Sequence, residues 1–265
     1  MTHTISEDNN LVLEEIDSDI LKHVQSALEE DMPQGDITTQ LLGINQKQGH
    51  ARFMAKQDLC LSGTDFVRAA FMLIDHNTKF QWHFGDGEEV LEGQSFLELE
   101  GNFMSFLKSE RVALNYLGRF SGIASLSRKF YEEVKHTKCK ILDTRKTTPL
   151  YRKWEKMAVV DGGCHNHRMN LSDAVMLKEN HILAAGSITK AVEAIRKRFH
   201  GPIEIETTNL KEVEEAVHSK PNRIMLDNMD NKLLVEALDI IPEGIETEAS
   251  GNMSLDRVKS VAELG

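Results

Sequence analysis

Residues 143–181 carry a cluster of positive charge within a chain that is acidic overall. The whole sequence has 31 Lys and Arg against 42 Asp and Glu, a formal net charge of −11. Residues 143–181 reverse this balance, with seven Lys and Arg against five Asp and Glu. The planar Arg fork matches a carboxylate in a two-point contact, and Lys binds phosphate as a point charge. The cluster therefore indicates a pocket for a small anion that carries both groups.

Two segments of this cluster could bind an anion through hydrogen bonds as well as through charge. The phrase DTRKTTP (143–149) adds hydroxyls and backbone amides, and GGCHNHR (162–168) adds amides beside imidazole and carboxamide groups. The alternative is that these cations are solvated surface residues, each paired with a nearby acid. Composition alone favours neither the anion-binding pocket nor the solvated surface.

Other kinds of site find less support. His165 and His167 could bind a metal, but no third ligand has convincing spacing, which disfavours a structural zinc site. Cys60, Cys139 and Cys164 are far apart and form no C-x-x-C pair, so we expect reduced thiols. The acidic charge argues against nonspecific nucleic-acid binding. With no long apolar run and no signal-peptide pattern at the start, we expect a cytoplasmic protein and no membrane association.

The elements that must position the cluster alternate after residue 138 between short β-branched runs and amphipathic helices. Strands are predicted in CKILDT, AVMLK, IEIET, RIMLDN and IETEAS, with helices between them, so the pattern predicts a parallel sheet. At or just before the carboxyl ends of these strands stand five polar residues: Asp143, Lys178, Glu206, Asp227 and Glu248. That edge carries the ligand site in α/β barrels and in open doubly wound sheets, so both architectures remain open. Glu206 and Asp227 could alternatively cap the helices that follow.

The residues before 138 predict a different kind of domain. We expect disorder over residues 1–10 and an amphipathic helix over 18–31. Strand-like runs between His50 and Gly101 surround one apolar helix at 64–74, which is typical of a small α+β domain. A long helical stretch covers 109–135, and its Ser121-Gly122 pair indicates a break or close packing.

Taken in order, several phrases resemble the type II phosphoribosyltransferases, and most closely the quinolinate phosphoribosyltransferase family. Together they span most of the chain, and GGCHNHRMNLSDAVMLKENH is the most specific of them. They are LEEDMPQGDITT (28–39), SERVALNYLGRFSGIAS (109–125), DTRKTTP (143–149), GGCHNHRMNLSDAVMLKENH (162–181), IEIE (203–206), MLDN (225–228) and TEASGN (247–252).

The resemblance implies an N-terminal α/β sandwich domain over residues 1–112 and a C-terminal, incomplete α/β barrel of parallel strands over 113–265. It implies an enzyme of NAD biosynthesis that converts quinolinate and phosphoribosyl pyrophosphate (PRPP) into nicotinate mononucleotide, CO₂ and pyrophosphate. It further implies Mg²⁺ as cofactor and a homodimer, or an assembly of dimers, in which the neighbour's sandwich domain covers each site.

The resemblance also assigns roles to individual residues. It implies that Glu206 and Asp227 face the ribose hydroxyls and Mg²⁺, and that Arg111 reaches a carboxylate in the neighbour's site. As catalytic residues it implies Lys146, Lys178, Glu206 and Asp227. Binding of the substrate's carboxylates and phosphates is implied for Arg145, Lys146, His167, Arg168, Lys178, Ser250, Gly251 and Asn252.

The chain departs from the family pattern at four places. Leu150, Cys164 and Asn252 stand where the family usually has Gly, so loop shape or specificity could differ. The sequence stops at Gly265, before the family's last strand and Gly-rich phosphate turn, and we expect this to affect PRPP more than quinolinate. Three alternatives stay open: an enzyme for another pyridine acid, a paralogue associated with molybdate transport, and a catalytically impaired anion-binding or assembly protein.

Overall fold

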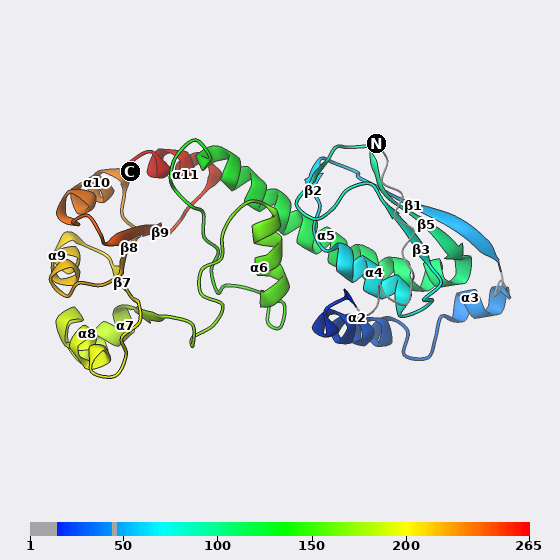
Figure 1. Cartoon of the computed structure of the whole chain (residues 1–265), viewed down its shortest axis with the longest axis horizontal. Coiled ribbons are helices and arrows are strands. Elements are labelled where there is room, and N and C mark those ends of the chain that lie inside the picture. The colour runs from blue at the N-terminus through cyan, green and yellow to red at the C-terminus, as the bar shows by residue number, and fades with distance from the viewer. Residues whose placement is uncertain (1–14, 44–46) are drawn as a thin grey trace. The chain divides into compact units, whose positions relative to one another are not determined.

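The computed structural model describes residues 15–43 and 47–265, so the start expected to be disordered lies outside the described residues. The chain forms two compact units (Figure 1). The first contains the described residues up to Arg128 together with Thr147–His165, and the second contains Lys129–Lys146 and Asn166–Gly265. The predicted domain boundary at 112/113 falls within one long helix and stays a prediction.

The first unit packs helices against antiparallel strands. Its strands are β1 (Gln48–Met54), β2 (Leu59–Cys60), β3 (Lys79–Trp82), β4 (Glu89–Val90) and β5 (Ser95–Asn102), and its helices are α2 (Ser18–Asp31), α3 (Ile37–Leu42), α4 (Thr64–Met72) and α6 (Arg152–Asp161), with most of α5 (Phe103–Val134). One sheet has the order β1-β5-β3, and β2 pairs with β4. The expected small α+β domain is therefore present.

Helix α2 covers the residues that the periodicity predicts. Ile20, Val24 and Leu28 recur on one face and are buried in the first unit's core. Asp17 caps the first turn, its carboxylate accepting the Asp19 N–H at 2.8 Å. The helix ends at Asp31, before Pro33, as the backbone restrictions around proline require.

Helix α5 is continuous through the Ser121-Gly122 pair, so the alternative of close packing applies there. The Ser121 hydroxyl accepts the Ser62 N–H at 3.1 Å and donates to the Ser62 carbonyl at 3.2 Å. Both residues are buried. Because the Ser121 hydroxyl pairs with both backbone groups of Ser62, α5 can pack closely against the loop that precedes α4.

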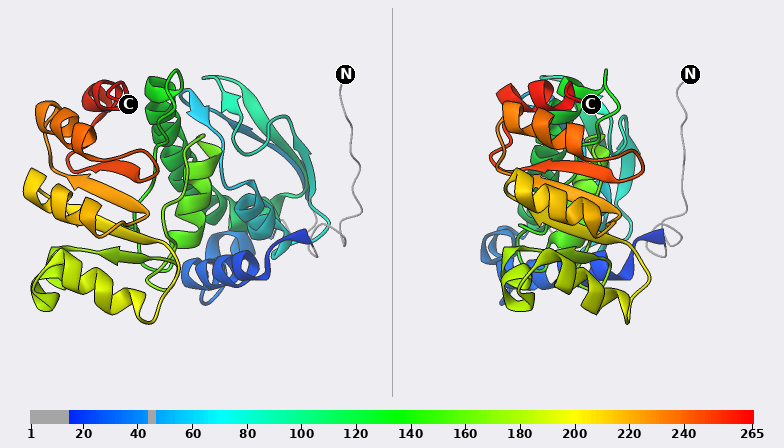
Figure 2. Two further views of the ribbon diagram at one scale, coloured as in Figure 1. Left: turned by 60° about the vertical axis from the view of Figure 1, so that its left-hand side comes forward. Right: turned by 90° about the vertical axis from the view of Figure 1, so that its left-hand side faces the viewer.

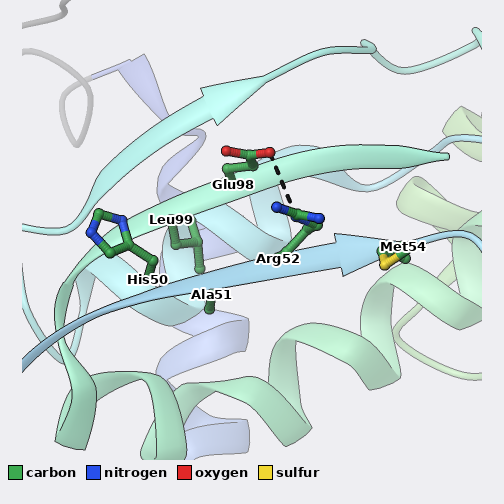
Figure 3. Close-up of a pocket in the computed structure, with 6 residues that line it drawn as sticks. All are labelled: His50, Ala51, Arg52, Met54, Glu98 and Leu99. Carbon is green, nitrogen blue, oxygen red and sulfur yellow. Dashed lines mark ion pairs between the residues drawn. The ribbon is translucent and has the colours of Figure 1, made fainter.

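A shallow pocket on the β1-β5 strand pair offers little for chemistry (Figure 3). Arg52 and Glu98 form an exposed ion pair across it, with 3.6 Å between Nε and Oε1. The pocket is lined by His50, Ala51, Arg52, Met54, Glu98 and Leu99. Exposed pairs of this kind contribute little stability.

The second unit holds a four-stranded parallel sheet of order β6-β7-β8-β9. Its strands are β6 (Val175–Leu177), β7 (Ile203–Thr207), β8 (Arg223–Asp227) and β9 (Glu246–Ser250), and its helices are α7 (Glu179–Ala185), α8 (Ile188–Arg196), α9 (Leu210–His218), α10 (Asn231–Ile240) and α11 (Leu255–Ala262). Four of the predicted strands are found. The expectation of a strand in CKILDT is wrong: that segment has only an isolated bridge at Leu142, because most of its residues are exposed or half-buried and it joins none of the sheets.

The two faces of this sheet differ in character. Helices α8, α9 and α10 line one face of the sheet (Figure 2). With residues of these helices, one apolar core contains Leu177, Ile203, Ile205, Ile224 and Leu226. Side chains alternate between the faces of a strand, so the residues between these positions lie on the other face. Register places together there the polar and charged residues Lys178, Glu204, Glu206, Arg223, Asp227, Glu246, Glu248 and Ser250.

Candidate active site

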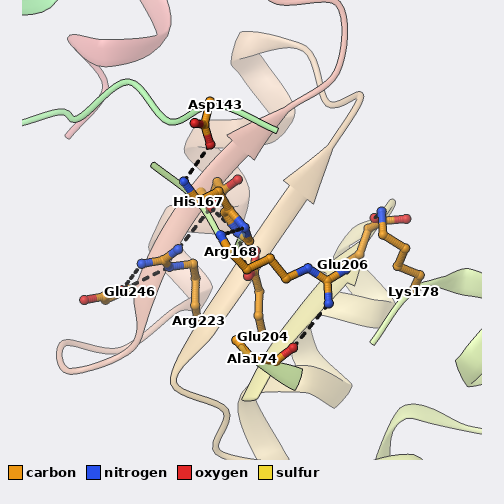
Figure 4. A network of polar contacts seen from close by, with 10 residues as sticks. Asp143, His167, Arg168, Ala174, Lys178, Glu204, Glu206, Arg223 and Glu246 are labelled. Atoms are coloured by element: carbon orange, nitrogen blue, oxygen red, sulfur yellow. Dashed lines mark hydrogen bonds and ion pairs between the residues drawn. The ribbon is translucent and has the colours of Figure 1, made fainter. Parts of the chain in front are cut away.

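His167 is held at both ring nitrogens on the polar face of the parallel sheet (Figure 4). Its Nδ1 accepts the backbone N–H of Arg168 at 2.8 Å, and its Nε2 lies 3.0 Å from Glu204 Oε2. A nitrogen that accepts a hydrogen bond carries no proton, so the neutral ring donates from Nε2 to Glu204. The backbone N–H of His167 donates to Asp143 Oδ1 at 2.8 Å. These contacts fix the position and orientation of the ring.

The ion network around His167 holds three carboxylates, those of Glu204, Glu246 and Glu248, against one guanidinium, that of Arg223. Glu248 lies 3.6 Å from Nε2 and 3.2 Å from Arg223 Nη1. The guanidinium of Arg223 also binds Glu246, with 2.6 Å between Nη2 and Oε2. Burial, followed by the charge of Glu204, raises the pKa of the Glu248 carboxyl above its usual value. The hydrogen bond to Glu204 raises the pKa of His167, while burial opposes the shift.

Arg168 follows His167 and carries its side chain across the sheet. Its Nη1 donates to the Ala174 carbonyl at 3.2 Å, just before β6 (Figure 4). The backbone is thus tied to the His167 ring and the guanidinium to the chain entering β6. This double attachment gives a cation a fixed place beside the start of β6.

Lys178 and Glu206 form an ion pair at the carboxyl ends of β6 and β7, with 2.8 Å between Nζ and Oε2. The Lys178 side chain is 47% exposed and that of Glu206 is 16% exposed. The Lys178 N–H donates to His181 Nδ1 at 3.0 Å, which explains the KENH phrase: the histidine fixes the backbone at the start of α7. A half-exposed ammonium held this way can exchange its partner for a bound anion.

The turns that follow β8 and β9 are joined by hydrogen bonds. Asn228 donates its amide to Asp227 at 2.7 Å and its N–H to the Ser250 carbonyl at 2.9 Å. Gly251 has φ +91°, and an added Cβ would lie 2.2 Å from Asn228 Oδ1. Asn252 has φ 49° and donates to Asn228 at 3.2 Å. Asn tolerates this left-handed region, so the departure from Gly at 252 keeps the turn.

The structure brings most of the predicted residues of the second unit to one region. His167, Arg168, Lys178, Glu206, Asp227 and the turn at 250–252 all border the polar face or its carboxyl edge. Arg145 is half-buried and Lys146 exposed in the loop that also carries Asp143. Arg111 lies in the first unit, exposed on α5. The roles given to all these residues stay predictions.

Three charged residues of this network, Glu204, Arg223 and Glu246, are not among the predicted site residues, and Glu248 had no predicted role. The missing signal was the two-residue period of the strands: Glu204 and Glu206 share a face, as do Arg223 and Asp227. Among the described residues, His167, Glu204 and Glu248 have potential ligand atoms within 4.8 Å of one another. Arg223 and the His167 hydrogen bond already satisfy much of this cluster, so its contacts describe an ion network.

Two family models match the chain. Residues 36–121 match the N-terminal domain of quinolinate phosphoribosyl transferase, and residues 123–265 match its C-terminal domain. A Synechocystis protein whose name is given as probable nicotinate-nucleotide pyrophosphorylase (carboxylating) is 42% identical over 247 residues, 91% of this chain and 83% of that protein. The tobacco (Nicotiana tabacum) quinolinate phosphoribosyltransferase (decarboxylating) 1b is 36% identical over 263 residues, 91% of this chain and 75% of that protein.

A solved structure agrees with these sequence matches. The nicotinate-nucleotide pyrophosphorylase from Francisella tularensis superposes with a TM-score of 0.89 at 34% identity, covering 100% of this chain and 92% of that one. Fold and site together define a two-domain α/β phosphoribosyltransferase. More narrowly, the chain belongs to the quinolinate phosphoribosyltransferase family. The resemblance and fold class that the sequence predicts are confirmed.

Proposed function

We propose that this protein transfers the phosphoribosyl group of PRPP to quinolinate, forming nicotinate mononucleotide, CO₂ and pyrophosphate for NAD biosynthesis. Membership of the family supports the reaction. The observation that carries it to this chain is the polar sheet face, which bears both the His167–Arg168 contact and the Lys178–Glu206 pair, the latter at the strands' carboxyl edge (Figure 4). An α/β sheet binds its ligands at that edge.

The dicarboxylate is bound by cations of two segments, the loop that carries Asp143 and the segment that carries His167. Arg168 offers a guanidinium fork to a carboxylate, and Arg145 and Lys146 supply further positive charge from the loop after Asp143. His167 supplies a ring whose place is already fixed. Two carboxylates on adjacent ring carbons need two cationic contacts in fixed positions, which a preorganised set of this kind provides.

The PRPP side lies at the ends of β7, β8 and β9. Glu206 and Asp227 face the ribose hydroxyls, and the 250–252 turn receives the 5′-phosphate through backbone N–H groups. The carboxylates of Glu206 and Asp227 also fit Mg²⁺, which prefers oxygen ligands and is commonly held by one or two carboxylates plus substrate phosphates. When bound, Mg²⁺ would neutralise charge on the pyrophosphate.

The reaction requires stabilisation of the charges that develop on the leaving group and the ribose ring, and it requires no side-chain nucleophile. The pyridine nitrogen forms a bond to the anomeric carbon as the bond from that carbon to the pyrophosphate oxygen breaks. Lys178 and Lys146 stabilise the departing oxyanion, and the carboxylate of Glu206 stabilises positive charge on the ribose ring. The adjacent carboxylate then leaves as CO₂; its bonding electrons stay on the ring carbon beside N⁺ and take up a proton.

The proposal includes a homodimer and a cytoplasmic location. Arg111, exposed on α5, would reach a carboxylate in the neighbouring subunit's site. Cys60, Cys139 and Cys164, all within the described residues, form no disulfide with one another, in keeping with a reducing compartment. None of the helices in the described part of the chain has the length and apolar character that crossing a bilayer requires.

Substrate discrimination tests the proposal. Incubation with quinolinate, PRPP and Mg²⁺ should yield nicotinate mononucleotide, detected by mass. Nicotinate lacks the second carboxylate and leaves a cationic group unpaired, so its kcat/KM should be lower by about 100-fold or more. Comparable turnover of the two acids would contradict the two-carboxylate site, and no product from quinolinate would contradict the proposed reaction itself.

A further inference from the structure

Glu204 is buried deeper than any other carboxylate of the polar face. The residue is 7% exposed and stands two positions before Glu206 on β7, on the same face of the sheet. Its Oε2 accepts the Nε2–H of His167 at 3.0 Å. No group within residues 15–43 and 47–265 hydrogen bonds to its Oε1. Burying a carboxylate is costly, so its place here points to a use beyond packing.

The contact made by Glu204 is the first of a chain of three. The carboxylate holds Nε2 of His167, the opposite ring nitrogen receives the Arg168 N–H at 2.8 Å, and the Arg168 guanidinium reaches the Ala174 carbonyl at 3.2 Å. A turn of the ring about its χ angles would break the hydrogen bond to the backbone of Arg168. The orientation of one buried carboxylate therefore bears on the place of the cation beyond it.

We propose that Glu204 is a positioning residue for the reaction: through Nε2 it fixes the ring of His167 and, through that ring, the backbone of Arg168 that carries the dicarboxylate-binding guanidinium. This inference rests on the proposed function. Glu204 touches no substrate in this scheme. Its loss should therefore act on quinolinate, which meets His167 and Arg168, and leave PRPP, which meets the ends of β7 to β9, nearly unaffected.

Arg223 and Glu248 complete the arrangement without replacing Glu204. Glu248 lies at 3.6 Å from Nε2, too far for a hydrogen bond of its own, and is bound by Arg223 at 3.2 Å. Arg223 in turn binds Glu246, whose side chain is 69% exposed and which makes no contact with His167 in the described network. Glu246→Gln is thus a matched control, since it alters the same ion network from its outer end.

The experiment combines three single variants with a double-mutant cycle. Glu204→Ala should raise the KM for quinolinate by about 10- to 100-fold and change the KM for PRPP by less than about twofold. Glu204→Gln should recover much of the loss, because its amide oxygen can still accept Nε2–H. Glu246→Gln should behave as wild type. In a His167→Ala background, Glu204→Ala should add almost nothing, since the residues act as a unit.

The proposal would be overturned if the effects of Glu204→Ala and His167→Ala on the KM for quinolinate multiplied in the double variant. It would also be overturned if Glu204→Ala changed the KM for quinolinate and the KM for PRPP equally. A readout that needs no activity separates this inference from the proposed function. Nitrogen NMR of the His167 ring should show a proton on Nε2 and none on Nδ1 in the wild type and in Glu204→Gln above the ring's pKa, and an altered tautomer balance in Glu204→Ala. A wild-type ring protonated on Nδ1 alone would refute the positioning role even in an active enzyme. A wild type that shows the expected tautomer but makes no product would refute the function and leave the geometry standing.

Discussion

Replacing Lys178 by Ala should abolish most activity while leaving the fold nearly intact. The side chain is 47% exposed and its ion pair with Glu206 spans 2.8 Å. Solvent-exposed pairs contribute about 0.2–1 kcal/mol, so the loss of unfolding free energy should not exceed about 1 kcal/mol. In catalysis the ammonium faces charge that develops on the leaving oxyanion, and removal of one such group lowers kcat by about 100- to 1,000-fold.

Nicotinate mononucleotide formation at saturating substrates measures the kcat of this variant, and urea unfolding measures its stability. Lys232→Ala is the control, because Lys232 is an 88% exposed lysine of the same unit, 3.8 Å from Glu236 on α10. It should change neither quantity. Retention of more than about a tenth of wild-type kcat in Lys178→Ala would refute the assigned role. A large loss of stability would mean that Lys178 supports the fold.

Three further predictions concern the turn, the histidine and the assembly. Gly251→Ala places a Cβ 2.2 Å from Asn228 Oδ1 at φ +91°, so it should cost at least about 2 kcal/mol and raise the KM for PRPP; unchanged unfolding and KM would contradict the tight turn. The pKa of His167 is raised above its usual 6.5, so the extra stability over His167→Asn should be complete below pH 6.5 and fall as pH rises through the folded-state pKa, measured by urea unfolding; a pH-independent difference would refute this. Arg111→Ala and Lys178→Ala, each nearly inactive alone, should recover about a quarter of wild-type activity when mixed, because one site in each mixed dimer is intact; no recovery would place the whole site in one chain.

The periodic elements could be predicted from the sequence because each buries a regular apolar stripe. The IEIET run is β7 residue for residue, and the helix predicted over 18–31 is α2. CKILDT failed although its β-branched content exceeds that of RIMLDN, because none of its side chains is fully buried and the segment pairs with none of the sheets. Short runs without such a face carry little information about their partners.

The location of the site could be predicted from the sequence, but the contacts between its side chains could not. Strand ends marked the carboxyl edge because chain order alone identifies them. The contact between His167 and Glu204 joins residues 37 positions apart, and His167 lies in an irregular segment before β6, outside any strand whose period could be counted. Pairing across a sheet of this kind is not visible in one sequence. Counting alternate positions along β7 would have placed Glu204 beside Glu206, but not beside the histidine.

The three Gly departures that the structure describes have different consequences. Asn252 keeps a left-handed backbone that Asn tolerates. Cys164 needs no positive φ and is buried, with its Sγ 3.2 Å from the Ser127 carbonyl. Leu150 has φ 68° and is 87% exposed, so its backbone is strained without a packing contact that offsets the strain. Only the last position departs from what its backbone favours.

The proposed transfer is tested by following the carboxylate that the reaction removes. Quinolinate labelled in the carboxyl carbon next to the ring nitrogen is incubated with the protein, PRPP and Mg²⁺, and labelled CO₂, nicotinate mononucleotide and pyrophosphate are counted together. We predict equal amounts of all three, and no CO₂ when PRPP is left out. Release of CO₂ without PRPP, or pyrophosphate without nicotinate mononucleotide, would contradict the account.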